Sequence, residues 1–106
     1  MHVPIQYREF YDVPRIFLLR HQEYLLLFDS AFDEDADEYS AFYEVYLLPE
    51  LSQEMLIGSW AHLKQTASQR LGRIPVAEVE FDATRRRYVD TSSLEPLIQD
   101  LMALHQ

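Results

Sequence analysis

Apolar residues in the first half of the chain follow the pattern of β-strands. Residues 5–11 and 39–48 follow a period of two, whereas the runs 16–19 and 24–28 are apolar throughout. Runs of this length that are rich in aromatic and branched side chains are typical of strands. We therefore predict an antiparallel hairpin from the two continuous runs, with its turn near residues 21–22 and further strands beside it.

Helical periodicity appears in the second half of the chain. Apolar residues recur at helical spacing through residues 60–71, and Gly72 suits the position that follows a helix. This pattern predicts a helix over residues 60–71. Ser92 and Glu95 have the spacing of a capping box before an apolar helical face, which predicts a second helix over residues 93–104.

Shorter extended segments complete the expected fold. Apolar and polar residues alternate through residues 75–81, which predicts a strand, and residues 86–90 form its partner strand after a turn. Residues 50–58 fit either one helical turn or a short strand. The predicted class is α+β, with a curled, mainly antiparallel sheet of about six strands and two helices. The length of 106 residues fits a single domain over residues 1–106.

The predicted sheet has an unusual requirement for cover on both of its faces. Strands 16–19 and 24–28 are apolar on both sides, and so largely is strand 39–48. In a sheet with one face exposed to solvent, apolar and polar residues should instead alternate along each strand. Two helices can cover one face. We therefore expect the other face either to close into a barrel-like curl or to meet a second subunit.

The composition of the chain argues against several classes of function for this protein. The chain has no cysteine, and its formal net charge is -9. Residues 1–53 hold eleven acidic and three basic residues, which makes that half strongly acidic. Direct binding of nucleic acid, which needs clustered lysine and arginine, is therefore not expected. The sequence shows no signal peptide and no uninterrupted apolar span, so the expected location is cytoplasmic, without membrane contact.

An acidic segment between two predicted strands is a candidate metal site. Four of its carboxylates match the ligand spacing of an EF-hand loop: Asp33, Asp35, Asp37 and Glu44. Glu38, however, stands where that loop requires a glycine. The alternative is a solvated loop that protects a strand edge. Divalent-cation binding at residues 33–44 stays open as a further function.

Basic residues in the second half form a candidate binding surface for a carboxylate- or phosphate-bearing partner. Its members are His62, Lys64, Arg70, Arg73, Arg85, Arg86 and Arg87. The alternative is internal pairing with Glu78, Glu80 and Asp82, together with favourable cations at a helix C-terminus. We expect internal pairing, because exposed pairs of this kind are common and weak.

Familiar catalytic signatures are missing from the sequence. Two glycines cannot build a glycine-rich phosphate cradle, and no Gly-x-Ser-x-Gly or metal-binding histidine pattern occurs. We therefore expect no cofactor and favour a protein that is not an enzyme.

The favoured function is a non-catalytic acidic protein-interaction module that self-associates as a homodimer. The alternative is a small-ligand binding domain or cofactor-free enzyme with a pocket between sheet and helices. Its candidate polar groups are Glu44, His62, Arg86 and Tyr88.

Overall fold

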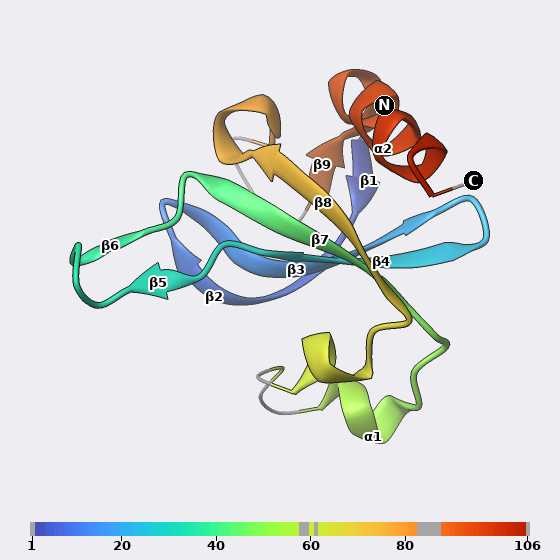
Figure 1. Cartoon of the computed structure of the whole chain (residues 1–106), viewed down its shortest axis with the longest axis horizontal. Coiled ribbons are helices and arrows are strands. Elements are labelled where there is room, and N and C mark those ends of the chain that lie inside the picture. The colour runs from blue at the N-terminus through green and yellow to red at the C-terminus, as the bar shows by residue number, and fades with distance from the viewer. Residues whose placement is uncertain (1, 58–59, 61, 83–87, 106) are drawn as a thin grey trace.

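The computed structural model describes residues 2–57, 60, 62–82 and 88–105. These residues form an antiparallel sheet with helices on both sides, which confirms the predicted α+β class (Figure 1). The strands are β1 (His2–Pro4), β2 (Gln6–Tyr11), β3 (Val13–His21), β4 (Tyr24–Asp29), β5 (Phe32–Asp33), β6 (Glu38–Tyr39), β7 (Phe42–Leu48), β8 (Gln69–Pro75) and β9 (Tyr88–Asp90). The α-helices are α1 (Gln53–Leu56) and α2 (Thr91–Ala103), and the 3-10 helices are η1 (Leu63–Thr66) and η2 (Val76–Glu78).

The main sheet has five strands in the order β2-β3-β4-β7-β8, and each neighbouring pair is antiparallel. The predicted hairpin is confirmed as β3 and β4, with Phe17 opposite Phe28 and His21 opposite Tyr24. Gln22 takes a left-handed φ of +56° in its turn. The two small sheets pair β1 with β9 and β5 with β6. The five-stranded sheet ends at β2 and β8 and is not closed into a barrel.

One face of the sheet carries an aromatic core. Phe17 and Phe28 stack with ring centroids 4.6 Å apart, and Tyr43 meets Phe17 edge-on at 5.2 Å. The Tyr43 hydroxyl is buried but donates a hydrogen bond of 2.6 Å to the Pro14 carbonyl. Leu94 and Ile98 of α2 are buried against this core. The predicted helix 93–104 is thereby confirmed, although it begins two residues earlier, at Thr91.

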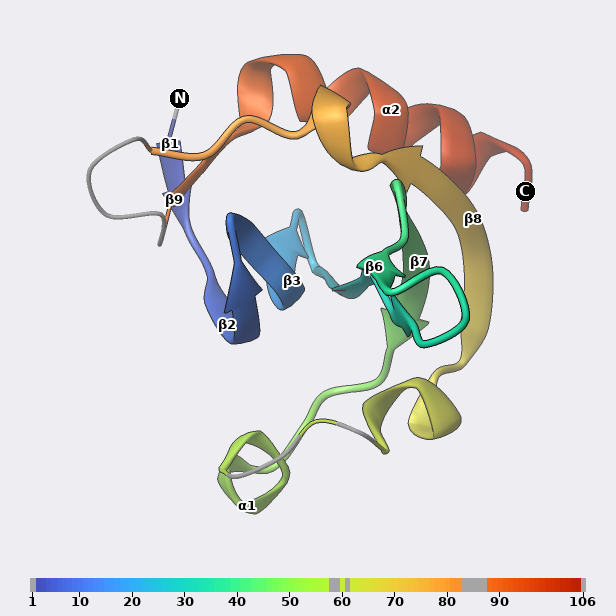
Figure 2. The ribbon, with the colours of Figure 1, turned by 90° about the vertical axis from the view of Figure 1, so that its left-hand side faces the viewer.

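The other face is covered by the chain itself. Leu18 and Leu27 of the sheet pack with the buried Trp60 and Leu63, which belong to the connection between β7 and β8. Arg8 extends from β2 over the Trp60 ring, 4.5 Å from its centroid. Figure 2 shows α2 and α1 on opposite sides of the sheet. The sheet does not close into the expected barrel-like curl. Leu51, Leu56, Trp60, Leu63 and Ala67 of the same chain pack on this face, so its cover does not by itself require a second subunit, and self-association stays a prediction.

The predicted helix over residues 60–71 was also wrong. Residues 63–66 form only the short η1, and Leu71 lies in β8, where it is buried in the sheet core. Trp60, Leu63 and Leu71 have helical spacing, but hydrogen bonding to β7 overrides this local pattern. Gly72 does take a positive φ, of +146°. It lies beside an irregularity in the β7–β8 register rather than after a helix.

Two further strands predicted in the second half of the chain differ from those in the structure. Residues 76–78 form η2 rather than a strand, and Phe81 makes a single bridge to Val89. The predicted strand 86–90 appears as β9 at residues 88–90, and residues 83–87 lie outside the described part of the chain.

Substitution of Gly72 tests its backbone conformation. We predict that Gly72→Ala lowers the free energy of unfolding in urea by about 1 to 3 kcal/mol, because φ of +146° is strained for a residue with a Cβ. An added Cβ would also lie 2.7 Å from Cδ2 of Leu101. The loss of unfolding free energy caused by Gly72→Ala should therefore also be measured in a Leu101→Ala background. A cost that vanishes there would assign the effect to the side-chain contact instead.

Candidate functional site

The β5–β6 hairpin extends beyond the sheet (Figure 1). Three aromatic rings gather there. Tyr39 of β6 meets Phe32 of β5 edge-on, with ring centroids 5.0 Å apart. Tyr11, the last residue of β2, stacks on Tyr39 at 5.6 Å. Tyr11 is 59% exposed and Phe32 46% exposed. We refer to Tyr11, Phe32 and Tyr39 as the aromatic tip.

Local hydrogen bonding explains why the hairpin places two of these rings side by side. Phe32 pairs with Tyr39 across β5 and β6, so both side chains project from the same position along the ladder. The Asp33 carboxylate accepts hydrogen bonds from the backbone nitrogens of Asp35 and Ala36, which closes the turn. Asp37 completes this turn with a left-handed φ of +54°.

The Arg15 guanidinium ties the aromatic tip to the sheet. It lies 4.8 Å from the Tyr39 ring centroid and donates a hydrogen bond of 2.9 Å to the Tyr11 carbonyl. It also donates to the hydroxyl of Ser30, which is fully buried and donates in turn to the Ser40 carbonyl. Arg15 thus contacts the end of β2 at the Tyr11 carbonyl, β6 at the Tyr39 ring, and Ser30 just before β5. The tip is therefore held in place before any partner arrives.

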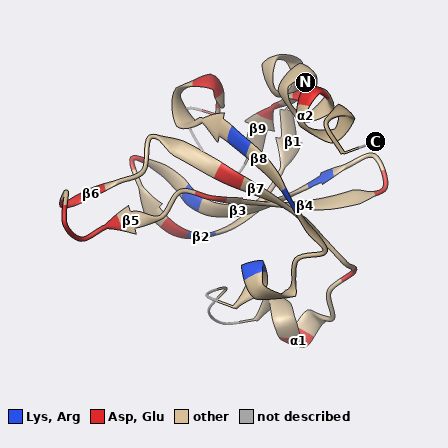
Figure 3. Cartoon of the chain, in the orientation of Figure 1, with Lys and Arg blue, Asp and Glu red and all other residues tan. Residues whose placement is uncertain are grey.

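Carboxylates surround the aromatic tip. The loop between β5 and β6 contains a run of acidic residues, and Figure 3 shows this end of the molecule coloured mainly red. We call this run the acidic rim; it consists of Asp33, Glu34, Asp35, Asp37 and Glu38. A hollow of about 570 Å³ is lined by the three rings together with Arg15, Asp37 and Glu38. The hollow thus combines aromatic rings with two carboxylates and one guanidinium.

Asp29 is a buried carboxyl near the base of the same hairpin. Its pKa lies above the ordinary value of 3.8, chiefly because burial disfavours the charged form, with smaller contributions from Glu9 and Glu44. Lys64 acts in the opposite direction from 3.8 Å away. The net shift is upward, so desolvation outweighs this ion pair.

The predicted basic surface does not gather into one patch among the described residues. Arg70 and Arg73 of β8 both pair with Glu44 of β7, and the Arg73 guanidinium also lies 5.1 Å from the Phe42 ring centroid. Lys64 pairs with Asp29, as described above. His62 precedes η1 and is exposed. These partners belong to β4 and β7. The expected pairing of Glu78, Glu80 and Asp82 across the last hairpin stays a prediction. Arg85, Arg86 and Arg87 lie outside the described residues.

The four predicted metal ligands are likewise not brought together. Asp33 accepts hydrogen bonds within its own turn, while Glu44 lies on β7 and binds two arginines. Asp35 and Asp37 are exposed in the β5–β6 loop. Among residues 2–57, 60, 62–82 and 88–105, no group of three or more histidine and carboxylate side chains is arranged to hold a metal ion.

The aromatic tip itself was missed at the level of sequence. Tyr11, Phe32 and Tyr39 read as ordinary strand residues, and aromatics are favoured in strands wherever they occur. The available signal was the position of Phe32 and Tyr39 immediately on either side of the acidic rim. Tyr11 carries no such signal, because it reaches the site only through the turn between β2 and β3.

Comparisons with protein-family models, with curated proteins and with solved structures gave no match. In the described part of the chain, no helix has the length and apolar character needed to cross a bilayer. The case for function therefore rests on the geometry of this chain.

The raised pKa of Asp29 generates a pH test. The folded protein holds this proton more tightly than the unfolded chain, so wild-type stability falls as pH rises from near 3.8 through the folded-state pKa. Asp29→Asn removes this titration. We predict that the stability of the variant relative to wild type increases over that interval, measured by urea unfolding at a series of pH values. A difference that is constant or that decreases would contradict the burial effect.

Proposed function

We propose that this chain is a non-catalytic interaction module whose aromatic tip binds a cationic segment of a partner protein. The observation that carries the proposal is the exposure of clustered rings beside carboxylates: Tyr11 is 59% and Phe32 46% exposed next to the acidic rim. Exposed aromatic clusters on small proteins commonly mark contact surfaces.

The chemistry of the hollow favours arginine or lysine. A guanidinium or ammonium group is attracted to the face of an aromatic ring and more strongly when carboxylates lie beside it. Arg15 already makes such a contact with Tyr39 at 4.8 Å. A partner cation over Tyr11 or Phe32 would extend the same arrangement outward, toward Asp37 and Glu38.

The net charge of -9 supports a basic partner rather than a second copy. Two acidic rims brought together would repel each other, whereas a basic segment would be steered toward the tip. The sheet face that motivated a homodimer is packed by Leu51, Leu56, Trp60, Leu63 and Ala67 of the same chain. We therefore assign the partner to a different protein, with the carboxylates guiding its approach and the rings supplying the contact area.

Binding of a short arginine-rich peptide tests this proposal. We predict saturable binding by fluorescence anisotropy that weakens as salt rises to about 0.15 M and above, because exposed charges become screened. A peptide with glutamine in place of arginine should not bind. Phe32→Ala should weaken binding about fivefold, the effect of losing one cation–π contact of about 1 kcal/mol.

Matched variants distinguish binding at the aromatic tip from general attraction by the negative net charge. Phe10 is exposed to the same 46% as Phe32 but faces Tyr7, at 6.0 Å, instead of the tip. Phe10→Ala should therefore leave the affinity unchanged. The pair Asp37→Asn and Glu38→Gln should weaken binding more than Glu54→Gln and Asp100→Asn, which remove equal charge from α1 and α2. Equal losses in the two pairs would overturn the proposal.

The oligomeric state provides an independent check. Light scattering coupled to size exclusion should find a monomer at micromolar concentration. A dimer that dissociates on Phe32→Ala would show that the aromatic tip binds a second copy, and would overturn the assignment to a basic partner.

A further inference from the structure

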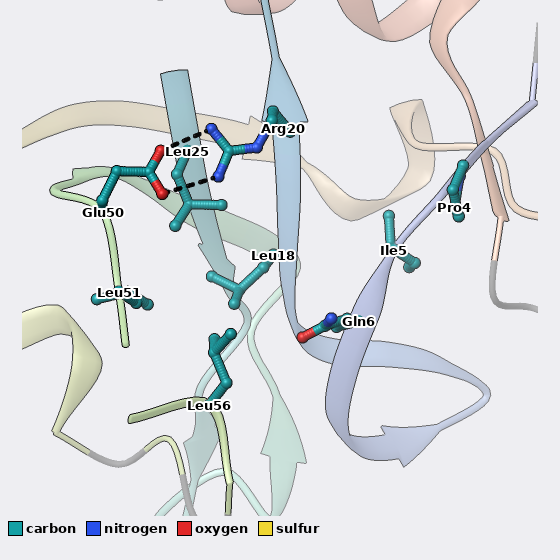
Figure 4. Close-up of a pocket in the computed structure, with 9 residues that line it drawn as sticks. All are labelled: Pro4, Ile5, Gln6, Leu18, Arg20, Leu25, Glu50, Leu51 and Leu56. Carbon is teal, nitrogen blue, oxygen red and sulfur yellow. Dashed lines mark hydrogen bonds and ion pairs between the residues drawn. The ribbon is translucent and has the colours of Figure 1, made fainter. Parts of the chain in front are cut away.

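A second hollow lies at the opposite end of β3, under the segment that follows β7 (Figure 4). Its volume is about 270 Å³. Its walls are largely apolar, and three polar side chains reach it. The lining residues are Pro4, Ile5, Gln6, Leu18, Arg20, Leu25, Glu50, Leu51 and Leu56. We refer to this hollow as the leucine pocket.

Incomplete cover of the second sheet face explains the leucine pocket. The short α1 buries none of its residues, and Leu51 and Leu56 are only half-buried. Trp60 and Leu63 fill the centre of the face farther along the chain. Leu18 and Leu25 of the β3–β4 hairpin are therefore left facing a gap toward β2. In Figure 4, Leu51 and Leu56 lie on one side of that gap and Ile5 and Gln6 on the other.

An ion pair spans one end of this pocket. The Arg20 guanidinium donates to both carboxylate oxygens of Glu50, at 2.9 and 3.3 Å. The two side chains differ in their support. Arg20 projects from β3, where it pairs with Leu25 of β4, and its side chain is 49% exposed, whereas Glu50 follows Pro49 in a connection and its side chain is 76% exposed. Glu50 is thus the partner that can leave at low cost.

We propose that the leucine pocket binds a small apolar monocarboxylate. The tail of this ligand lies among the leucines, and its carboxylate replaces that of Glu50 on Arg20. The guanidinium already holds a carboxylate in the two-bond geometry that such a ligand would present. An apolar cavity of about 150 Å³ accepts a benzene ring, so 270 Å³ leaves room for a ring with a short acid chain.

Phenylacetate is a suitable probe because close analogues change only its head group. We predict that NMR titration with phenylacetate shifts the methyl signals of Leu18, Leu25 and Leu56. Phenethylamine and phenylacetamide have the same ring and similar length, but the amine offers Arg20 no acceptor and the amide offers one uncharged carbonyl oxygen in place of a carboxylate. They should bind about two- to fivefold more weakly, the effect of losing an exposed charge pair. Equal affinity for the three compounds would overturn the proposed head-group recognition.

Variants of the ion pair supply the decisive comparison. Glu50→Gln removes the internal competitor and should tighten phenylacetate binding by up to about fivefold, a gain that misfolding cannot produce. Arg20→Gln should abolish the preference for phenylacetate over phenylacetamide. Arg73→Gln, which breaks another surface pair on β8, serves as the control. It should change neither the affinity for phenylacetate nor the preference for phenylacetate over phenylacetamide. Weaker binding in Glu50→Gln would assign the ligand contact to Glu50 and overturn the proposal.

The two proposals can fail separately. Phe32→Ala alters the aromatic tip and should leave phenylacetate affinity unchanged, whereas Arg20→Gln should leave peptide binding unchanged. Loss of both activities in either variant would indicate unfolding, which its melting curve would reveal, and Glu50→Gln would then remain the test.

Discussion

A sheet with two apolar faces is the constraint from which the rest of this structure follows. Leu18 and Leu27 point to one side of the β3–β4 hairpin, while Phe17 and Phe28 point to the other, and all four are buried. Burial of such side chains is the main favourable term in folding, so neither face can be left in water. A chain of 106 residues has little material for two covers. It uses α2 for one face and the connection between β7 and β8 for the other.

The unequal quality of these covers explains where binding surfaces arise. On the first face, α2 inserts Leu94 and Ile98 into a closed aromatic core. The second cover is anchored mainly by Trp60 and Leu63, and its earlier part lies loosely over the sheet. The leucine pocket occupies that loosely covered corner. The β5–β6 hairpin extends past both covers, so its rings stay exposed and are held by Arg15 rather than by burial.

The fold could be predicted where local pattern and tertiary context agree. The β3–β4 hairpin and α2 meet this condition, because their apolar residues have the period of the element that they form. Residues 60–71 do not, since Trp60, Leu63 and Leu71 satisfy a helical period while β7 offers an unpaired edge to residues 69–75. Ladder hydrogen bonds at that edge, together with burial of Leu71, prevail over a weak local preference. This competition cannot be evaluated from spacing alone.

The chemistry of the sites was harder to predict, because charge pairing is decided by strand order. Glu44 was a candidate ligand beside Asp33 in a metal site, yet it faces β8 and binds Arg70 and Arg73. This pairing removes two arginines from the predicted basic surface and one carboxylate from the predicted metal loop. In the described part of the chain no ion pair joins a carboxylate of the acidic rim, and Arg15 is the cation that lines the hollow beside Asp37 and Glu38. Their charge is directed outward, and an external cation over the neighbouring rings is the interaction that would offset it.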